Sequence, residues 1–309
     1  MEESERRASK RGMRAPALFI GFPSPMLVRD NEYAKALRRC GIQLRQPRGI
    51  VVASAHWHTV RPLRVTGSQK PRQLHDYGDY PSWLNSMSYP CPGAPALANR
   101  VASLLQGAGT PAVVDMGQGL DFASWMPLSL LYASAKVPIV EVSLPAGGTP
   151  EDMMAVGRAL APLRAAGFMI VGTGAVVCNP HRVRHDNQNA TPEGWAREFD
   201  EWVSDRLQAL DIDSLLQYRR QGPHAHMSAP TAEYLDPLFF VLGANQQGDR
   251  IMTLFEGFHS GALSMRTCLL VGRRKDDLRL PDELVNGAAE RVGINQVEPD
   301  QQPAPTRST

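Results

Sequence analysis

Two strand-like runs of the sequence end near side chains that could do chemistry. The apolar run 49–54 leads to His56, and the run 168–172 leads through a Gly-Thr-Gly turn to Cys178. An imidazole can be a metal ligand, a general base or a charge partner, or simply a hydrogen-bonded residue at a strand end. A cysteine is a nucleophile only as the thiolate, and it is more often a small buried hydrophobe. The sequence alone leaves these alternatives open.

Further histidines give weaker signals. His75 precedes Asp76, which could hold the imidazole in one tautomer or cap a turn. His58 would point to the same side as His56 if the strand continued, although a turn is an equal alternative. The others are a pair without a nearby third ligand, a pair in a charged run that predicts solvation, and one ambiguous residue, namely His224 and His226, His181 and His185, and His259.

The loop at residues 21–25 raises a different question. It follows the apolar run 17–20 and reads Gly-Phe-Pro-Ser-Pro, a composition typical of a ligand-binding turn. The residue placed for chemistry in that turn is Phe22, which has no acid, base or ligand atom.

Alternating apolar runs and helical patterns predict the elements that position these residues. We expect one α/β domain with a mostly parallel, mixed central sheet flanked by helices, and ligands beyond the carboxyl ends of its strands. The Gly-Thr-Gly turn lacks the third glycine of a dinucleotide fingerprint, and neither a GxxxxGK[ST] loop nor a GxSxG elbow occurs. The strand candidates are 17–21, 49–54, 112–114, 137–143, 168–172, 250–255 and 265–271, and the helix candidates are 31–39, 95–106, 150–165, 192–209 and 231–242.

Composition narrows the class of protein. Of 309 residues, 43% are hydrophobic and 21% charged, and the net charge of +2 comes without a basic stripe, so we expect neither nucleic-acid nor membrane partners. The four cysteines form no CxxC pair, which argues against a zinc finger or a disulfide framework. No apolar run approaches the roughly 20 residues that span a bilayer. Together these features favour a cytoplasmic location. We expect disordered tails at 1–14 and over most of 275–309, around a folded body at 15–274.

Six segments in order resemble the DODA-type extradiol ring-cleavage dioxygenases of the class III, LigB-like superfamily. The resemblance implies a single-domain α/β protein that binds a divalent metal, iron in active enzymes and sometimes zinc, and splits catechols such as DOPA. The segments are GFPSPM at 21–26, SAHW at 54–57, HDYGDYP at 75–81, GLDFASW at 119–125, GTGAVVCN at 172–179 and EGFHSGALSMR at 256–266.

The same resemblance marks departures at the family's histidine positions. His56 retains the SAHW metal ligand, whereas Phe22, Phe122, Cys178 and Tyr234 stand where the family pattern has histidine. Because iron that activates dioxygen typically needs two histidines and a carboxylate, or a comparable set, the substitutions imply a retained pocket without its iron chemistry.

Three hypotheses follow, all with a small aromatic molecule as the ligand. The first is a metal-independent enzyme, without a cofactor, for isomerisation, cyclisation or elimination of an aromatic, quinoid or polyketide-like metabolite. In it His56, His75 and Cys178 are catalytic, and Phe22, Phe122 and Tyr234 bind substrate. The second is a ring-opening dioxygenase with Fe(II) or Zn(II) on a remodelled His56, Cys178 and Tyr234 site. The third is a non-catalytic binding protein. The sequence predicts no oligomeric state.

Overall fold

The computed structural model describes residues 14–78 and 80–272. The expected tails at 1–13 and 275–309 therefore lie outside the described residues. Arg14, expected in the first tail, belongs to the folded body, because its guanidinium donates to the side chain of Gln246 and lies 3.4 Å from Asp249.

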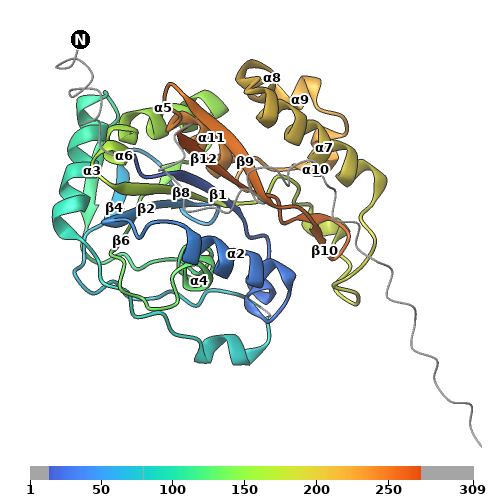
Figure 1. Cartoon of the computed structure of the whole chain (residues 1–309), viewed down its shortest axis with the longest axis horizontal. Coiled ribbons are helices and arrows are strands. Elements are labelled where there is room, and N and C mark those ends of the chain that lie inside the picture. Colours follow the sequence, from blue (N-terminus) through green and yellow to red (C-terminus); the bar gives the residue numbers. More distant parts are fainter. Residues whose placement is uncertain (1–13, 79, 273–309) are drawn as a thin grey trace, which may run out of the picture.

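A six-stranded mixed sheet forms the centre of the domain, in the order β6-β2-β8-β1-β12-β9 (Figure 1). The first four strands pair in parallel and the last two pair antiparallel, as expected for a mostly parallel, mixed sheet. The strands are β6 (Ile139–Glu141), β2 (Gly49–Ser54), β8 (Phe168–Gly174), β1 (Ala17–Gly21), β12 (Thr267–Gly272) and β9 (Asp249–Phe255). The central strands are buried on both faces and are accordingly apolar throughout.

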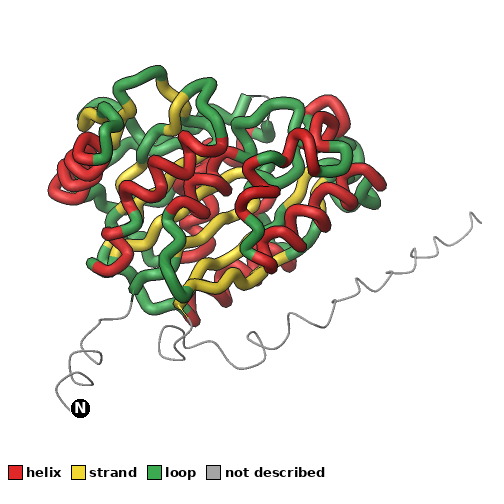
Figure 2. Tube along the Cα trace, turned by 90° about the horizontal axis from the view of Figure 1, so that it is seen from above, coloured by secondary structure: helices red, strands yellow, loops and turns green. Residues whose placement is uncertain are grey.

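Helices cover both faces of this sheet, so that the strands run between helices when the molecule is seen from above (Figure 2). Each face has its own apolar core. One core holds α3 (Pro95–Gly107), α5 (Pro150–Leu160), α6 (Pro162–Ala165) and α11 (Asp236–Gly243), and the other holds α2 (Glu32–Gln43) and α4 (Phe122–Leu131). The domain is thus a three-layer α/β unit.

A helical subregion lies beside the antiparallel edge of the sheet. Its helices are α7 (Gly194–Ala209), α8 (Ile212–Leu216), α9 (Tyr218–Gln221) and α10 (Ala225–Ser228), and it packs near the small hairpin of β10 (Phe258–His259) and β11 (Leu263–Ser264) (Figure 1). A buried ion pair fixes α7 to this edge, since the Arg266 Nε donates to Asp200 at 3.0 Å and a second guanidinium nitrogen donates to Glu256 at 2.7 Å.

The observed elements differ from the sequence expectations at identifiable places. The predicted helix 150–165 is divided at Ala161, because Pro162 cannot donate the next helical hydrogen bond. The predicted helix 231–242 begins only at Asp236. Strand β5 (Ala112–Asp115) pairs with β4 (Leu63–Thr66) outside the central sheet.

Helix α4 was not predicted. It is buried on nearly every side and contains Pro127, so neither an amphipathic period nor a proline-free run marks it. The remaining short elements are η1 (Pro25–Val28), η2 (Ser82–Ser86), η3 (Pro180–Arg182), β3 (His58–Thr59) and β7 (Leu144–Pro145). Within the described residues no helix is both long enough and apolar enough to cross a bilayer.

Candidate functional site

The carboxyl ends of β1, β2 and β8 meet at one edge of the sheet. The amide of Phe22 donates to the carbonyl of Gly174 at 2.7 Å, and the amide of Ala55 donates to the carbonyl of Thr173 at 3.0 Å. These main-chain hydrogen bonds bring together the three loops that the sequence marks, as expected for ligand sites of open α/β sheets.

The start of α11 joins this edge because β8 carries glycine at the points of contact. A Cβ on Gly174 would lie 2.2 Å from the Tyr234 carbonyl oxygen, and a Cβ on Gly172 would lie 2.3 Å from the Pro237 carbonyl oxygen. The Tyr234 carbonyl instead accepts a hydrogen bond from Ala175 at 2.7 Å. The Gly-Thr-Gly segment at the end of β8 therefore allows close packing of the chain at the start of α11, which places the Tyr234 ring at the site.

His56 lies between two aromatic rings. Its ring centroid is 4.6 Å from that of Phe122 and 5.8 Å from that of Tyr234, with the tyrosine edge-on at 86°. The side chain keeps solvent contact, yet the surrounding protein disfavours its charged form and lowers its pKa, an effect that the Asp121 carboxylate partly opposes. His56 is accordingly a neutral imidazole at neutral pH, the form that can accept a proton.

His75 belongs to the same aromatic chain but does not adjoin His56. Its ring contacts Tyr77 and Trp125, and Tyr77 in turn contacts Phe122 at 5.2 Å between centroids. Its Nε2 lies 3.1 Å from the Met87 carbonyl, so main chain orients the imidazole. Orientation by Asp76 is only one of the two alternatives that the sequence leaves open. The structure thus connects the two histidines through two rings and gives no direct path for a proton between them.

Cys178 is a buried thiol beside Tyr234. It is 4% exposed, and burial raises its pKa to about 12, with a smaller opposing effect from the hydrogen bond to Tyr234. This shift runs opposite to the activation that a nucleophilic cysteine needs, so we do not carry the thiolate hypothesis further. Burial also raises the pKa of Tyr234 to about 12, which keeps its hydroxyl protonated and able to donate.

The two phenylalanines differ in their surroundings. Phe22 is 1% exposed and packs in the core on the α2 and α4 face, so its ring offers almost no free surface to a ligand in this structure. Phe122 is 8% exposed and contacts His56 directly.

A pair of carboxyl groups, Asp121 and Glu141, lies next to Phe122 and was not expected from the sequence pattern. Asp121 caps α4 through the Ser124 amide at 2.9 Å, and Glu141 accepts from the Asp121 amide at 3.0 Å and from the Ser124 hydroxyl at 2.9 Å. Complete burial, followed by the neighbouring Asp121 charge, raises the pKa of Glu141 well above its ordinary value. A cap residue is visible in sequence, but an acid inside a strand such as β6 gives no signal of its partner.

A second unforeseen pair ties the loop after His56 to α11. The His58 Nε2 lies 3.1 Å from the Asp236 carboxylate, and the two side chains are 12% and 5% exposed. The other weak candidates, His224 and His226, do not form a common site. His224 pairs with Glu198 on the surface at 3.0 Å, and His226 is exposed.

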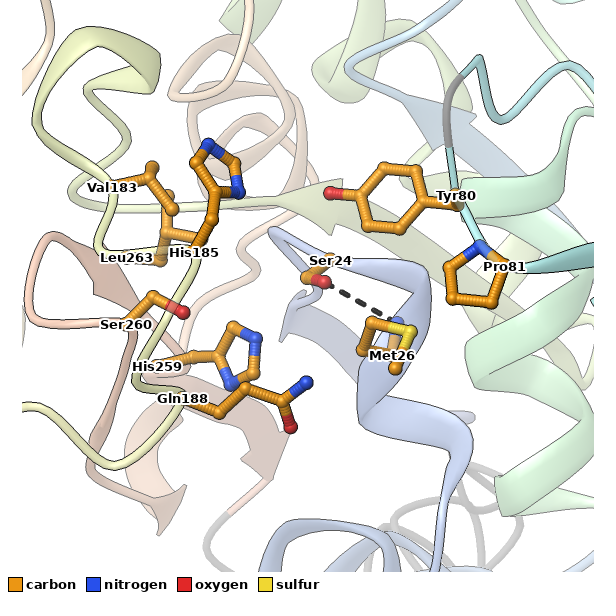
Figure 3. A pocket seen from close by; sticks show the side chains of 10 residues that line it. All are labelled: Ser24, Met26, Tyr80, Pro81, Val183, His185, Gln188, His259, Ser260 and Leu263. Carbon is orange, nitrogen blue, oxygen red and sulfur yellow. Dashed lines mark hydrogen bonds between the residues drawn. The ribbon is translucent and has the colours of Figure 1, made fainter.

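A cavity of about 480 Å³ opens next to Cys178 and Tyr234. Leu263 and Val183 join it to the site, because both pack in a small cluster with those two residues. It is lined by Ser24, Met26, Tyr80, Pro81, Val183, His185, Gln188, His259, Ser260 and Leu263 (Figure 3). His185, expected only to be solvated, and the ambiguous His259 both line this cavity.

The side chains near His56 do not fit a dioxygen-activating iron site. Its ring neighbours are Phe122, which has no ligand atom, and Tyr234, which packs beside the buried Cys178. Among the residues that the structure describes, no group of three or more His, Cys, Asp or Glu side chains is arranged to hold a metal ion. Two histidines and a carboxylate, the usual set for such iron, are not assembled there.

Fold and site define a three-layer α/β protein with an aromatic-lined site beyond its parallel strands. Residues 25–262 match the family described as the catalytic LigB subunit of aromatic ring-opening dioxygenase, and the chain belongs to this family. It is 38% identical over 258 residues to the 4,5-DOPA dioxygenase extradiol of Escherichia coli (strain K12), covering 82% of this chain and 93% of that protein. It is 35% identical over 203 residues to the protein of the same description from Mirabilis jalapa, covering 66% and 75%.

Among solved structures, the chain resembles the crystal structure of an uncharacterized protein from Escherichia coli K12. The TM-score is 0.70 at 35% sequence identity, and the match covers 83% of this chain and 99% of the other. The expected LigB-like fold is thereby confirmed.

Proposed function

We propose that this protein binds a small aromatic, quinoid or polyketide-like molecule and catalyses a metal-independent, non-oxidative step on it, with His56 as general base. The observation that carries the proposal is a neutral, accessible imidazole held between the rings of Phe122 and Tyr234. Isomerisation, cyclisation and elimination can each begin with removal of a proton from a carbon atom or a hydroxyl group, which a neutral imidazole can accept.

Each group around His56 has a role in this proposal. The substrate ring packs against Phe122, where aromatic contacts in edge or offset geometry are favourable. The protonated Tyr234 hydroxyl donates a hydrogen bond to the oxygen on which negative charge develops. His75 holds Tyr77, and through it Phe122, in place. A direct role for His75 in proton transfer is a prediction, and the turnover rate of His75→Ala tests it.

The test combines two measurements on untagged protein. Metal content is determined alongside oxygen consumption with DOPA and simple catechols, and hydroxylated aromatic acids and quinones are incubated in deuterium oxide to detect proton exchange at carbon by NMR. We expect exchange or turnover without metal, lost in His56→Ala and retained in the exposed control His226→Ala. Stoichiometric iron together with oxygen consumption by the wild-type protein would refute the proposal.

The family match favours a second candidate, a metal-dependent aromatic ring-opening dioxygenase. Its metal, Fe(II) or Zn(II), would rest on His56, Cys178 and Tyr234, of which His56 and Tyr234 are ring neighbours and Cys178 and Tyr234 pack in one small cluster. Anaerobic reconstitution with Fe(II), followed by oxygen uptake with DOPA, tests this candidate. Protein that takes up no oxygen after reconstitution with Fe(II) excludes the dioxygenase candidate. Ligand binding without turnover in the proton-exchange assay and in the oxygen-uptake assay supports a non-catalytic binding protein instead.

For the cellular setting we propose a cytoplasmic protein of aromatic-compound metabolism, without nucleic-acid or membrane partners. The near-neutral net charge and the absence of CxxC pairs in the sequence support this setting. Fractionation of the native host, followed by immunodetection, tests the location.

A further inference from the structure

The carboxyl pair of Asp121 and Glu141 lies in the protein interior without a cation. Glu141 is fully buried in β6, and Asp121, the residue that caps α4, is 7% exposed. Neither side chain forms an ion pair with any described residue. Arg64 of the adjoining strand β4 turns to the surface, where it pairs with Asp115 at 2.7 Å. Ionisation of both buried carboxyl groups is therefore strongly disfavoured, because the two charges would repel each other without compensation.

The hydrogen bonds around this pair leave one acceptor oxygen free. The Glu141 carboxyl group accepts from the Asp121 amide through Oε2 and from the Ser124 hydroxyl through Oε1. Asp121 Oδ1 accepts from the Ser124 amide, but Asp121 Oδ2 is buried and has no donor among the described residues. A proton on the Glu141 carboxyl group would supply the donor that this oxygen lacks.

We propose that Glu141 and Asp121 hold a single proton between them at neutral pH, with the Glu141 carboxyl group donating to Asp121 Oδ2 and Asp121 carrying the negative charge. Both are positioning residues for His56. The acid fixes Asp121, Asp121 caps α4, and α4 begins with Phe122, whose ring centroid lies 4.6 Å from that of His56. The role at His56 rests on the function proposed for that residue, whereas the shared proton does not.

The electrostatic effects within this part of the fold agree in direction with the shared proton. Burial, followed by the Asp121 charge, raises the pKa of Glu141 well above its ordinary value. Burial lowers the pKa of His56, and the Asp121 carboxylate opposes this effect. Smaller effects at His56 come from His58, which lowers its pKa, and from Asp76, which raises it. The charge on Asp121 therefore helps to set how readily His56 accepts a proton.

Infrared spectroscopy of the full chain tests the shared proton directly, because the C=O stretching band of a carboxylic acid is separate from the bands of a carboxylate. At pH 7 we expect an acid band that shifts when glutamate carboxyl groups are labelled with carbon-13 and that is lost in Glu141→Gln. The labelling result needs no variant, so it decides the question even where Glu141→Gln folds poorly. An acid band that does not come from glutamate, or that persists in Glu141→Gln, would overturn the proposal.

NMR titration of the imidazole signals tests the role of the pair at His56. Asp121→Asn removes the charge and should lower the His56 pKa, whereas Glu141→Gln exchanges one neutral group for another and should leave it near the wild-type value. Asp205→Asn, an exposed acid on α7, is the matched control and should leave the His56 pKa unchanged. An unchanged value in Asp121→Asn, or an equal decrease in Glu141→Gln and Asp121→Asn, contradicts the assignment.

The position of Phe122 gives a further readout in the same spectra. Glu141→Ala removes the donor to Asp121 Oδ2 and should change the ring-current shift that Phe122 imposes on His56, and the amide nitrogen of Glu141→Gln should restore that shift. Identical shifts in wild type and Glu141→Ala would argue against positioning. None of these measurements needs turnover. Absence of proton exchange in the wild-type protein would refute the function proposed for His56 and leave the spectra unaffected, so the two failures are distinguishable.

Discussion

The pair of His58 and Asp236 allows a sharp test of how burial and charge compete in this protein. The Asp236 carboxylate is 5% exposed and lies 3.1 Å from the His58 imidazole. Burial raises the pKa of Asp236 above its ordinary value, and the hydrogen bond to His58 opposes this shift without overcoming it. Ionisation of this carboxyl group is therefore less favourable in the folded protein than in the unfolded chain.

The sign of the pH dependence follows from that shift. A group whose folded-state pKa is raised contributes stability that is fully present below its unfolded pKa, here 3.8, and that is lost as pH rises through the folded value. Asp236→Asn keeps the shape of the side chain but removes this titration. We therefore expect wild type to lose stability relative to Asp236→Asn as pH rises from 4 to 7, with the two within about 1 kcal/mol at pH 7.

Asp236→Ala is expected to behave differently. It leaves the imidazole of His58, which is 12% exposed, without its hydrogen-bond acceptor, at a cost of about 1–3 kcal/mol at pH 7. The assay is urea unfolding followed by tryptophan fluorescence at several pH values, with Asp205→Asn on the exposed face of α7 as the control. A wild type that gains stability over Asp236→Asn as pH rises would show that ion pairing outweighs burial and would refute the reasoning.

Three further predictions test the frame of the site. Gly174→Ala should cost about 1–3 kcal/mol in the free energy of unfolding, because its Cβ would lie 2.2 Å from the Tyr234 carbonyl oxygen; thermal unfolding measures this. Arg266→Gln should cost about 3–5 kcal/mol, because it leaves the buried Asp200 carboxylate uncompensated; urea unfolding measures this. Cys178 in the native protein should react with iodoacetamide at least about 100-fold more slowly than in urea, because burial raises its pKa to about 12; mass spectrometry of the alkylated peptides measures this.

Each of these has a matched control. Gly107→Ala meets open space and should not destabilise the protein, so an equal loss at both glycines would contradict the packing argument. Arg38→Gln removes an exposed ion pair and should change the free energy of unfolding by less than about 0.5 kcal/mol. Fast alkylation of native Cys178 would restore the thiolate hypothesis that burial argues against.

The central sheet could be predicted from the sequence because its strands are short apolar runs with clear ends. The predicted strands 17–21 and 49–54 agree with the observed bounds of β1 and β2, since burial on both faces demands continuous apolar residues. Helix α4 could not be predicted, because a helix buried on all sides has no amphipathic period. The sequence pattern predicts β5 as a strand, but it does not predict that β5 pairs with β4 outside the central sheet. Strand pairing depends on contacts that a local pattern does not encode.

The candidate site was predictable in its position and less so in its chemistry. Strand ends indicated His56 and Cys178, but only the fold shows that one is accessible and the other buried, and that distinction decides which can move a proton. The partner of His58 lies 178 residues away in sequence, so no local pattern could connect it with Asp236. His185 looked like part of a solvated charge run, and it lines the cavity because the hairpin tip folds against its loop.

The backbone hydrogen bonds at the strand ends have a consequence for how this site can change over evolution or in the laboratory. Phe22, Ala55, Cys178 and the Tyr234 carbonyl are each anchored by main-chain groups, to Gly174, Thr173, Ser228 and Ala175 respectively. No side-chain replacement other than proline at residues 22, 56, 178 or 234 removes the donor or acceptor of any of these anchors. The four positions can therefore exchange catalytic groups as a set while the loops keep their places, which makes this domain a suitable starting point for installing or exchanging chemistries by mutation.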